Sequence, residues 1–298
     1  MTQPVAPLTF TRRSLVLASA GMVTGCTLNP DRDHLGADAP RALPLRKPVR
    51  VAWVFSSGGP RGFTHVGVLK ALEQMDLKPD LIAGSSVGAL VGSLCAAGLS
   101  ASALESLAME LQPLSLARLA LGQQERLSGA AVAELVRLHA PVSLLEQMPV
   151  AMACVAARRR DGAAVAFTAG DAGVAVQAAA AIEGQFAPVR IRGEQYLDAD
   201  WSAPLPVRLA RALGAQRVLA VDASVHLDGA PPGAARYRES DLRKKALIDG
   251  DAALADLVLK PDFGYWVNMS QEFRARAIEA GYRDTMAREP ALRALHRT

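Results

Sequence analysis

A serine stands between two glycines in the segment Ile82 to Leu90, which reads IAGSSVGAL. An apolar stretch ends at Gly84 and a run of small apolar residues follows Gly88, so the segment predicts a strand, a sharp turn and a helix. The spacing Gly84-x-Ser86-x-Gly88 is that of a nucleophile elbow. Such a turn strains the serine backbone, and the helix N-terminus favours negative charge beside it. The pattern therefore predicts attack by the Ser86 hydroxyl on an acyl carbon.

A second glycine-rich turn, Ser56-Ser57-Gly58-Gly59-Pro60-Arg61-Gly62, precedes an apolar-periodic helix. Proline fits the first helical turn but has no N–H, so we expect the amides of Gly58, Gly59 and Arg61 to face an anion. The helix returns the chain to the strand before Ser86, which predicts a parallel βαβ unit with both turns at one sheet edge. A phosphate-binding loop is the alternative, but the Gly-Lys-Ser/Thr sequence and the Rossmann spacing are absent.

The elements that must carry these turns alternate along the chain. Predicted strands cover residues 49–55, 80–83, 150–157, 163–168, 217–221 and 257–259. Predicted helices cover residues 60–76, 89–97, 174–182, 208–213, 246–257 and 270–288, with further helices between 100 and 147. Residues 229–243 are rich in proline, glycine and charge, and predict a loop or mobile flap.

The N-terminus has the pattern of an export signal. Arg12 and Arg13 precede a short apolar stretch that leads to Val23-Thr24-Gly25-Cys26. The paired arginines suggest a twin-arginine signal, and Cys26 occupies the acylated position of a bacterial lipoprotein. We therefore expect a signal peptide over residues 1–25, a lipid-anchored tether over 26–47 and a folded domain over 48–298. An ordinary signal peptide with an incidental cysteine and a cytosolic helix remain alternatives.

The composition argues against several classes of protein. The 298 residues are 50% hydrophobic and carry a formal net charge of +4, which falls to +2 without Arg12 and Arg13. The basic residues are scattered, so a nucleic-acid partner is not expected. Cys95 and Cys154 lie in apolar runs and are expected to be buried thiols, although a disulfide between them is possible. Histidine and cysteine do not cluster, so neither a metal site nor a cofactor is predicted.

Several motifs occur in an order that resembles the patatin-like phospholipase family. They are Ser57-Gly58-Gly59-Pro60-Arg61-Gly62, the segment from His65 to Leu69, Gly84-Ser85-Ser86-Val87-Gly88, residues 180–189, and Tyr196-Leu197-Asp198 with Pro204-Leu205-Pro206-Val207. The similarity extends from about Val49 to Asp222. It implies an α/β fold, a three-layer α/β/α sandwich with a mainly parallel central sheet.

The resemblance also implies roles for individual residues. It makes Ser86 the nucleophile, Asp198 the general base of a Ser–Asp dyad, and Gly58, Gly59, Arg61 and Gly62 the oxyanion hole. A desolvated carboxylate is a better base than one in water, so Asp198 can accept the Ser86 proton. The expected activity is hydrolysis of carboxylic esters of lipids or lysophospholipids through an acyl-enzyme. With the lipid anchor expected at Cys26, the protein is expected at a membrane of the cell envelope, facing the periplasm.

Two motifs depart from the family pattern. Ser57 stands where a third glycine usually begins the glycine-rich turn, and Asp198-Ala199-Asp200 replaces Asp-Gly-Gly or Asp-Gly-Ala. This substitution motivates an alternative function, a catalytically silent envelope lipoprotein that binds acyl chains or a protein partner. A Ser–His–Asp triad with His226 is the alternative mechanism, because the order Ser–Asp–His is available. Phe263, Tyr265 and Trp266 could form a lipid-facing lip or pack a loop onto the domain.

Overall fold

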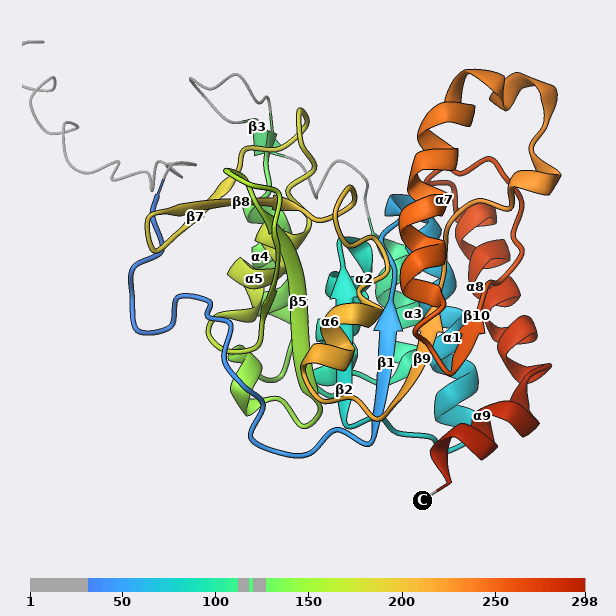
Figure 1. The fold of residues 1–298 in the computed structure, drawn as a ribbon, viewed down its shortest axis with the longest axis horizontal. Helices are drawn as coiled ribbons and strands as arrows, with labels where there is room; N and C mark the ends of the chain where they lie inside the picture. The colour runs from blue at the N-terminus through green and yellow to red at the C-terminus, as the bar shows by residue number, and fades with distance from the viewer. Residues whose placement is uncertain (1–31, 112–117, 120–126, 298) are drawn as a thin grey trace, which may run out of the picture.

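The computed structural model describes residues 32–111, 118–119 and 127–297. Its centre is an eight-stranded sheet in the order β10-β9-β1-β2-β5-β8-β7, with β6 paired to β5 (Figure 1). The strands of this sheet are β1 (Val51–Phe55), β2 (Leu81–Ser85), β5 (Ala151–Arg158), β6 (Ala164–Phe167), β7 (Val189–Ile191), β8 (Glu194–Asp198), β9 (Arg217–Val221) and β10 (Leu257–Leu259). A separate short ribbon pairs β3 (Arg118–Leu119) with β4 (Leu127–Ser128).

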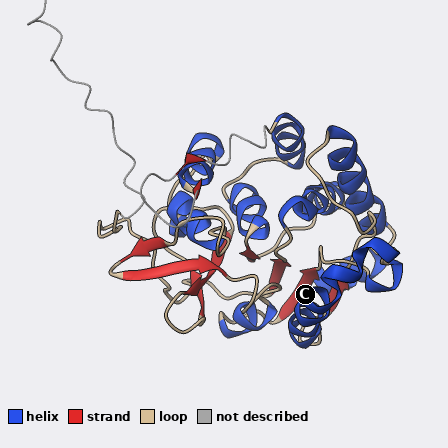
Figure 2. Ribbon diagram, turned by 90° about the horizontal axis from the view of Figure 1, so that it is seen from above, coloured by secondary structure: helices blue, strands red, loops and turns tan. Residues whose placement is uncertain are grey.

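The five strands from β10 to β5 are mutually parallel, whereas β6, β7 and β8 pair antiparallel. Helices lie on both sides of the sheet when it is viewed from above (Figure 2). The helices are α1 (Phe63–Gln74), α2 (Val87–Ala96), α3 (Ala101–Glu110), α4 (Ala130–His139), α5 (Ala172–Ala179), α6 (Val207–Ala212), α7 (Arg238–Ala252), α8 (Gln271–Met286) and α9 (Glu289–His296). The predicted α/β architecture with a mainly parallel sheet is confirmed.

Each face of the sheet has its own hydrophobic core. Along β1, Trp53 and Phe55 pack with helices α1 to α5 and α8, whereas Ala52 and Val54 pack with α6 and α7. Successive side chains of a strand point to opposite faces, so a parallel strand covered on both sides must be apolar throughout. This explains why β1 and β2 are continuous apolar runs with every residue buried.

Helices α1 and α8 pack with almost no space between their backbones. A Cβ atom placed on Gly67 would lie 1.8 Å from the Ile278 carbonyl oxygen, and one on Gly281 would lie 2.2 Å from the Thr64 oxygen. Only glycine fits at both positions, since real Cβ atoms do not approach other heavy atoms so closely. The C-terminal helix is therefore fixed against the helix that follows the glycine-rich turn.

The segment from 238 to 243 differs from the expectation of a loop or flap, because helix α7 already begins at Arg238. Glu239 and Asp241 lie in its first turn, where negative charge interacts favourably with the helix dipole. The high charge of this segment indicated a loop, but it reflects a helix whose residues are mostly exposed.

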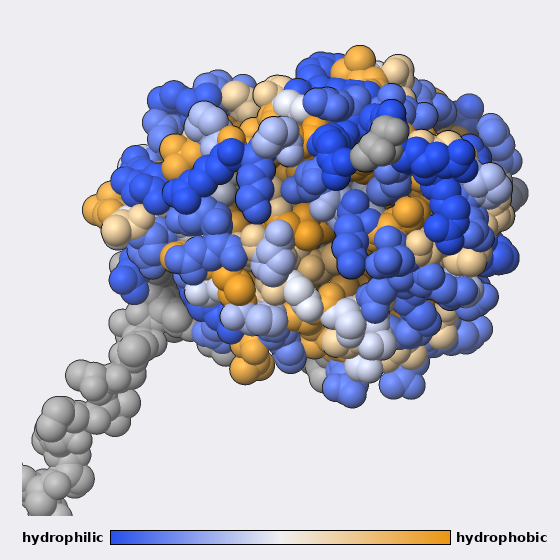
Figure 3. Space-filling model, turned by 90° about the horizontal axis from the view of Figure 1, so that it is seen from below, coloured by the Kyte–Doolittle hydropathy of each residue, from blue (hydrophilic) through white to orange (hydrophobic). Residues whose placement is uncertain are grey.

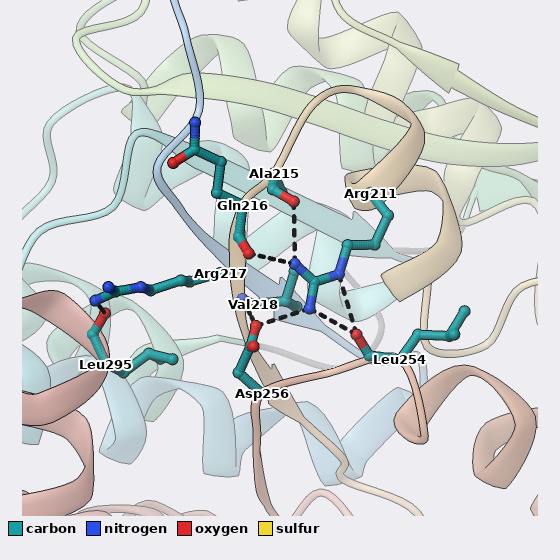
Figure 4. Close-up of polar contacts among 8 residues, drawn as sticks. All are labelled: Arg211, Ala215, Gln216, Arg217, Val218, Leu254, Asp256 and Leu295. Atoms are coloured by element: carbon teal, nitrogen blue, oxygen red, sulfur yellow. Dashed lines mark hydrogen bonds and ion pairs between the residues drawn. The ribbon is translucent and has the colours of Figure 1, made fainter.

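At the N-terminal end of β9, one arginine joins three elements (Figure 4). The Arg211 guanidinium, at the end of α6, donates to the carbonyl oxygens of Ala215, Gln216 and Leu254 and pairs with Asp256 at 2.7 Å. The same Asp256 carboxylate accepts the Val218 N–H. These bonds fix the start of β9 against the segment that leads into β10.

Residues 32–47 do not form the free tether that was expected. Ala39 is buried, and backbone bonds link His34 to Arg190 and Arg41 to Ala169. The Thr168 hydroxyl accepts the Leu43 N–H at 2.9 Å and donates to the Leu43 carbonyl at 2.6 Å. This segment therefore covers the β6 and β7 edge of the sheet. Its richness in proline, aspartate and glycine reflects an irregular path along the domain.

The expected signal peptide and Cys26 lie outside the described residues. Within the residues that the structure does describe, none of the helices combines the length and the apolar character needed to cross a bilayer. The face seen from below is mostly hydrophilic, with hydrophobic side chains dispersed among polar ones (Figure 3).

Candidate active site

Ser86 occupies the predicted corner between β2 and α2. Its backbone has φ 53° and ψ −123°, a strained conformation for a residue with a side chain, and its exposed fraction is only 6%. The two flanking glycines are required by close approach. A Cβ atom on Gly84 would lie 2.3 Å from the Gly88 carbonyl oxygen, and one on Gly88 would lie 2.4 Å from the Phe55 oxygen. The sequence pattern thus places a serine hydroxyl at the N-terminus of α2.

The glycine-rich turn lies beside this elbow and leads into α1. Gly58 and Gly59 adopt φ values of 153° and 55°, which glycine reaches without steric cost. Among the hydrogen bonds of the described residues, none engages the N–H of Gly58 or Gly59. These two amides are free to stabilise an oxyanion.

Arg61 differs from the expectation that its N–H donates to the same anion, whereas the role expected of Gly62 there stays a prediction. The Arg61 N–H already donates to the Gly58 carbonyl at 3.1 Å, so it closes the turn and is not free. A Cβ atom on Gly62 would lie 2.3 Å from the Val87 side chain. Gly62 therefore lets the turn pack closely against the helix that carries Ser86.

Asp198 is the last residue of β8, paired with Ala156 of β5. Burial raises its pKa from 3.8 to about 7, and the neighbouring Asp200 carboxylate also raises it. The Ser86 hydroxyl, the Asp200 N–H and Lys244 act in the opposite direction. The Asp200 N–H donates to Oδ1 at 2.8 Å, while Oδ2 makes no hydrogen bond of normal geometry to a described residue. Ser86 and Asp198 thus meet, with one carboxylate oxygen available.

Two cavities meet at Ser86. The first, of about 320 Å³, has a mixed lining that contains the charged side chains and is called the polar cavity; it is lined by Gly58, Arg158, Asp198, Asp200, Trp201 and Lys244 among others. The second, of about 240 Å³, is almost entirely apolar and is lined mainly by residues of α1 to α4, including Val66, Leu90, Leu94, Leu104, Leu107 and Leu135. A hydroxyl between a polar opening and an apolar pocket is suited to an amphipathic ester.

The histidines do not complete a triad in the described residues. No histidine lines the polar cavity. His226 instead contacts the Pro261 carbonyl at 3.2 Å. His65 is fully buried beneath the glycine-rich turn, where its Nε2 lies 2.9 Å from the Ser56 carbonyl and burial lowers its pKa to about 4. A neutral His65 can donate to that carbonyl and so hold the turn in place.

The unusual segment 198–200 is accommodated without strain at its central residue. Ala199 is fully buried and has no positive φ, so a glycine is not required there. Asp200 accepts a short hydrogen bond from the Ser57 hydroxyl and pairs with Lys244 of α7 at 2.5 Å. Lys244 was not among the predicted site residues, because it lies in a run of charged residues and nothing in that run indicates which element its side chain will contact.

The remaining candidates have mainly structural positions. Cys95 and Cys154 are free, and burial raises the pKa of the Cys95 thiol to about 12. Phe263 and Tyr265 are buried, whereas Trp266 is half exposed. The described residues hold no group of three or more histidine, cysteine or acidic side chains that could bind a metal ion.

The fold and the elbow define an α/β protein with a serine at a sharp turn between a strand and a helix. A model of the patatin-like phospholipase family matches residues 53–211, more than half of the chain. The chain belongs to the patatin-like phospholipase family. The matched residues include the glycine-rich turn, Ser86 and Asp198.

Relatives agree with this family. Uncharacterized NTE family proteins of Mycobacterium tuberculosis and Mycobacterium bovis are 32% identical over 231 residues, which cover 74% of this chain and 62% of theirs. The human patatin-like phospholipase domain-containing protein 6 is 45% identical over 60 residues, 20% of this chain and 4% of that protein. The crystal structure of VipD from Legionella pneumophila shares the fold, with a TM-score of 0.56, 14% identity, and coverage of 84% of this chain and 67% of that one.

Proposed function

We propose that this protein hydrolyses carboxylic esters of lipids, with phospholipids or lysophospholipids as the substrate class. The observation that carries the proposal is the position of Ser86 between the polar and the apolar cavity, beside the buried Asp198. The acyl chain would lie in the apolar pocket and the head group in the polar opening. The family match supports the same class of reaction.

The geometry supports a two-step mechanism. Asp198 accepts the Ser86 proton while Oγ attacks the ester carbonyl, and the amides of Gly58 and Gly59 stabilise the tetrahedral oxyanion. As the intermediate collapses, the carbon–oxygen bond breaks and Asp198 returns the proton to the departing alcohol. A water molecule then attacks the acyl-enzyme, gives its proton to Asp198 and releases the fatty acid. Ser86 recovers its proton in the last step.

Fluorophosphonate labelling tests the assignment on protein that lacks residues 1–26. We expect an adduct on Ser86 and hydrolysis of a short-chain ester, both lost in Ser86→Ala and strongly reduced in Asp198→Ala. The His226→Ala variant is the control and should keep both activities. Turnover retained by a folded Ser86→Ala protein would contradict the proposal. Absence of any adduct on the folded wild type would favour the silent acyl-binding lipoprotein.

We also propose that Cys26 carries a lipid anchor that holds the protein in the cell envelope, facing the periplasm. The proposal rests on the sequence Val23-Thr24-Gly25-Cys26 after a short apolar stretch. Full-length protein in a bacterial host should incorporate labelled palmitate and partition with membranes, whereas Cys26→Ser should do neither. Equal labelling of both proteins would contradict the anchor.

A further inference from the structure

Three side chains form a cluster between the glycine-rich turn and α7. The Ser57 hydroxyl donates a hydrogen bond to Asp200 Oδ1, and Lys244 Nζ lies 2.5 Å from the same oxygen. The Asp200 and Lys244 side chains are 29% and 22% exposed, so both are largely covered. Ser57, Asp200 and Lys244 come from three separate elements. Asp200 and Lys244 line the cavity that opens on Ser86, and Ser57 adjoins it.

The cluster consists of the two departures from the family pattern and one residue that joins them. Glycine at positions 57 and 200 could supply neither the hydroxyl nor the carboxylate. The Asp200 carboxylate is partly desolvated, and such a charge needs a partner, which Lys244 supplies. The Ser57 N–H donates to Pro204 at 2.8 Å, so this residue is fixed through both its backbone and its side chain. The two substitutions therefore act together.

The cluster is directly connected to the general base. The Asp200 N–H holds Asp198 Oδ1 at 2.8 Å, which leaves Oδ2 for Ser86. The Asp200 charge disfavours the ionised form of Asp198, whereas the Lys244 charge favours it. The balance between these two charges thus acts on the group that must accept the proton.

We propose that Ser57, Asp200 and Lys244 form a positioning cluster. It links the glycine-rich turn to the segment 198–200 and adjusts how readily Asp198 accepts the Ser86 proton. This inference rests on the proposed hydrolase function. Lys244 is a positioning residue in it, because it acts through Asp200. The cluster replaces the flexible glycines with a fixed, charge-balanced contact.

Other charged groups line the same cavity and limit the effect that Asp200 and Lys244 can have on the ionisation of Asp198. Arg61 comes from the glycine-rich turn, Arg158 and Arg159 from β5 and its end, and Glu183 from the segment after α5. Arg61 donates to the Tyr265 carbonyl at 3.1 Å, Arg158 binds Asp161 at 3.1 Å and Arg159 donates to Gln195 at 3.0 Å. Among the described residues, Lys244 is the cation that forms an ion pair with the 198–200 turn.

The pH dependence of ester turnover tests the proposal, since the rate should rise as Asp198 ionises. Lys244→Met leaves the Asp200 charge unbalanced, so the rising limb of the pH–rate curve should move to higher pH by about half to one unit. At pH values below this limb the rate should therefore fall about three- to tenfold. Asp200→Asn removes the like charge and should move the limb to lower pH. The double variant should lie between the two single variants. Lys245→Met, on the same helix but paired with Asp249, is the control and should leave the limb unchanged.

Movement of the limb in the same direction for Lys244→Met and Asp200→Asn, or no movement in either, would overturn the proposal. A second measurement does not need turnover. The difference in the free energy of unfolding between the wild type and Asp198→Asn appears over the pH range in which Asp198 ionises. When both proteins also carry Lys244→Met, this pH range should move upward. If Ser86-dependent turnover is absent but this shift is present, the hydrolase function fails and the effect of the cluster on Asp198 stands.

Discussion

Asp198 combines two properties that a base in contact with a serine needs. Its burial raises the pKa to about 7, so the carboxylate is a stronger base than an aspartate in water, yet half of it is ionised near neutral pH. Its free oxygen lies beside a serine whose backbone is fixed in a strained conformation. At this scale the site depends on desolvation more than on any single hydrogen bond.

We expect turnover at low substrate concentration to rise with pH through a single ionisation near pH 7. The reason is that Asp198 must lose its proton before it can accept the one from Ser86, and its pKa in the folded protein is about 7. The value of kcat/KM for a short-chain ester, measured from pH 5 to pH 9, checks this. A limb near pH 4, as for an exposed aspartate, would contradict the buried base.

The same desolvation should reduce stability. Because the pKa is raised from 3.8 to about 7, the folded state binds the Asp198 proton more tightly than the unfolded state does. The contribution to stability is complete below pH 3.8 and is lost as pH rises to about 7. Asp198→Asn should therefore stabilise the protein above pH 7, by at most about 4 kcal/mol, and have little effect below pH 4.

Urea unfolding at pH 4 and pH 8 measures this difference. Asp161→Asn is the matched control, since Asp161 is exposed and its pKa is lowered by the Ala163 N–H and by Arg158. That variant should not be stabilised at pH 8. An equal effect of Asp198→Asn at both pH values would contradict a strongly raised pKa.

At the scale of elements, the site is built from the ends of β1, β2 and β8 and the beginnings of α1 and α2. The sequence predicted the first two strands and both helices, because each turn has local glycine spacing and each helix has its own apolar run. It could not predict the contact between Ser57, Asp200 and Lys244, since these residues are far apart in sequence and carry no periodic signal. The antiparallel strands β7 and β8 were likewise not among the predicted strands.

The contact between α1 and α8 should be sensitive to one methyl group. Gly67→Ala would place Cβ 1.8 Å from the Ile278 carbonyl oxygen, so the helices must separate. We expect a loss of about 1 to 3 kcal/mol in the free energy of unfolding, as for other overpacked sites. Gly250→Ala in α7 is the control, because its Cβ would meet no atom within 4 Å and should stabilise the helix by about 0.5 to 1 kcal/mol. Equal effects in urea unfolding would contradict the close packing.

The apolar pocket formed by α1 to α4 should determine which acyl chains are accepted. Leu104 of α3 lines this pocket, and Leu104→Trp would fill part of it. We expect kcat/KM for long-chain esters to fall at least about tenfold, with little change for a short-chain ester, because each buried methylene contributes about 0.8 kcal/mol. Leu138→Trp, on the exposed face of α4, is the control and should change neither. An equal loss for all chain lengths would contradict the pocket as the acyl site.

At the scale of the whole molecule, one edge of the sheet is covered by the N-terminal end of the described chain. The N-terminal segment lies along the β6 and β7 edge, while β10 forms the other edge (Figure 1). The composition of residues 32–47 indicated a tether, because irregular backbone bonds and only two buried residues, Ala39 and Pro40, leave no periodic pattern. Only the tertiary structure shows that these residues protect a strand edge, which would otherwise be open to pairing with another chain.

Removal of this segment should therefore destabilise the domain. A protein starting at residue 48 exposes the β7 edge and loses the bonds to Arg190, Ala169 and Thr168 that residues 34–43 make. We expect its Tm to fall by about 4 to 10 °C relative to a protein starting at residue 32, the effect of a loss of about 2 to 3 kcal/mol in a domain of this size. Differential scanning calorimetry checks the difference.

A substitution separates loss of these contacts from loss of the chain itself. Thr168→Val keeps the shape of the side chain but removes both hydrogen bonds to Leu43, so it should lower Tm when residues 32–47 are present. In the protein that starts at residue 48 the same substitution should have little further effect, because its partner is already gone. Additive losses in the two proteins, or equal Tm values with and without residues 32–47, would mean that the segment is a tether after all.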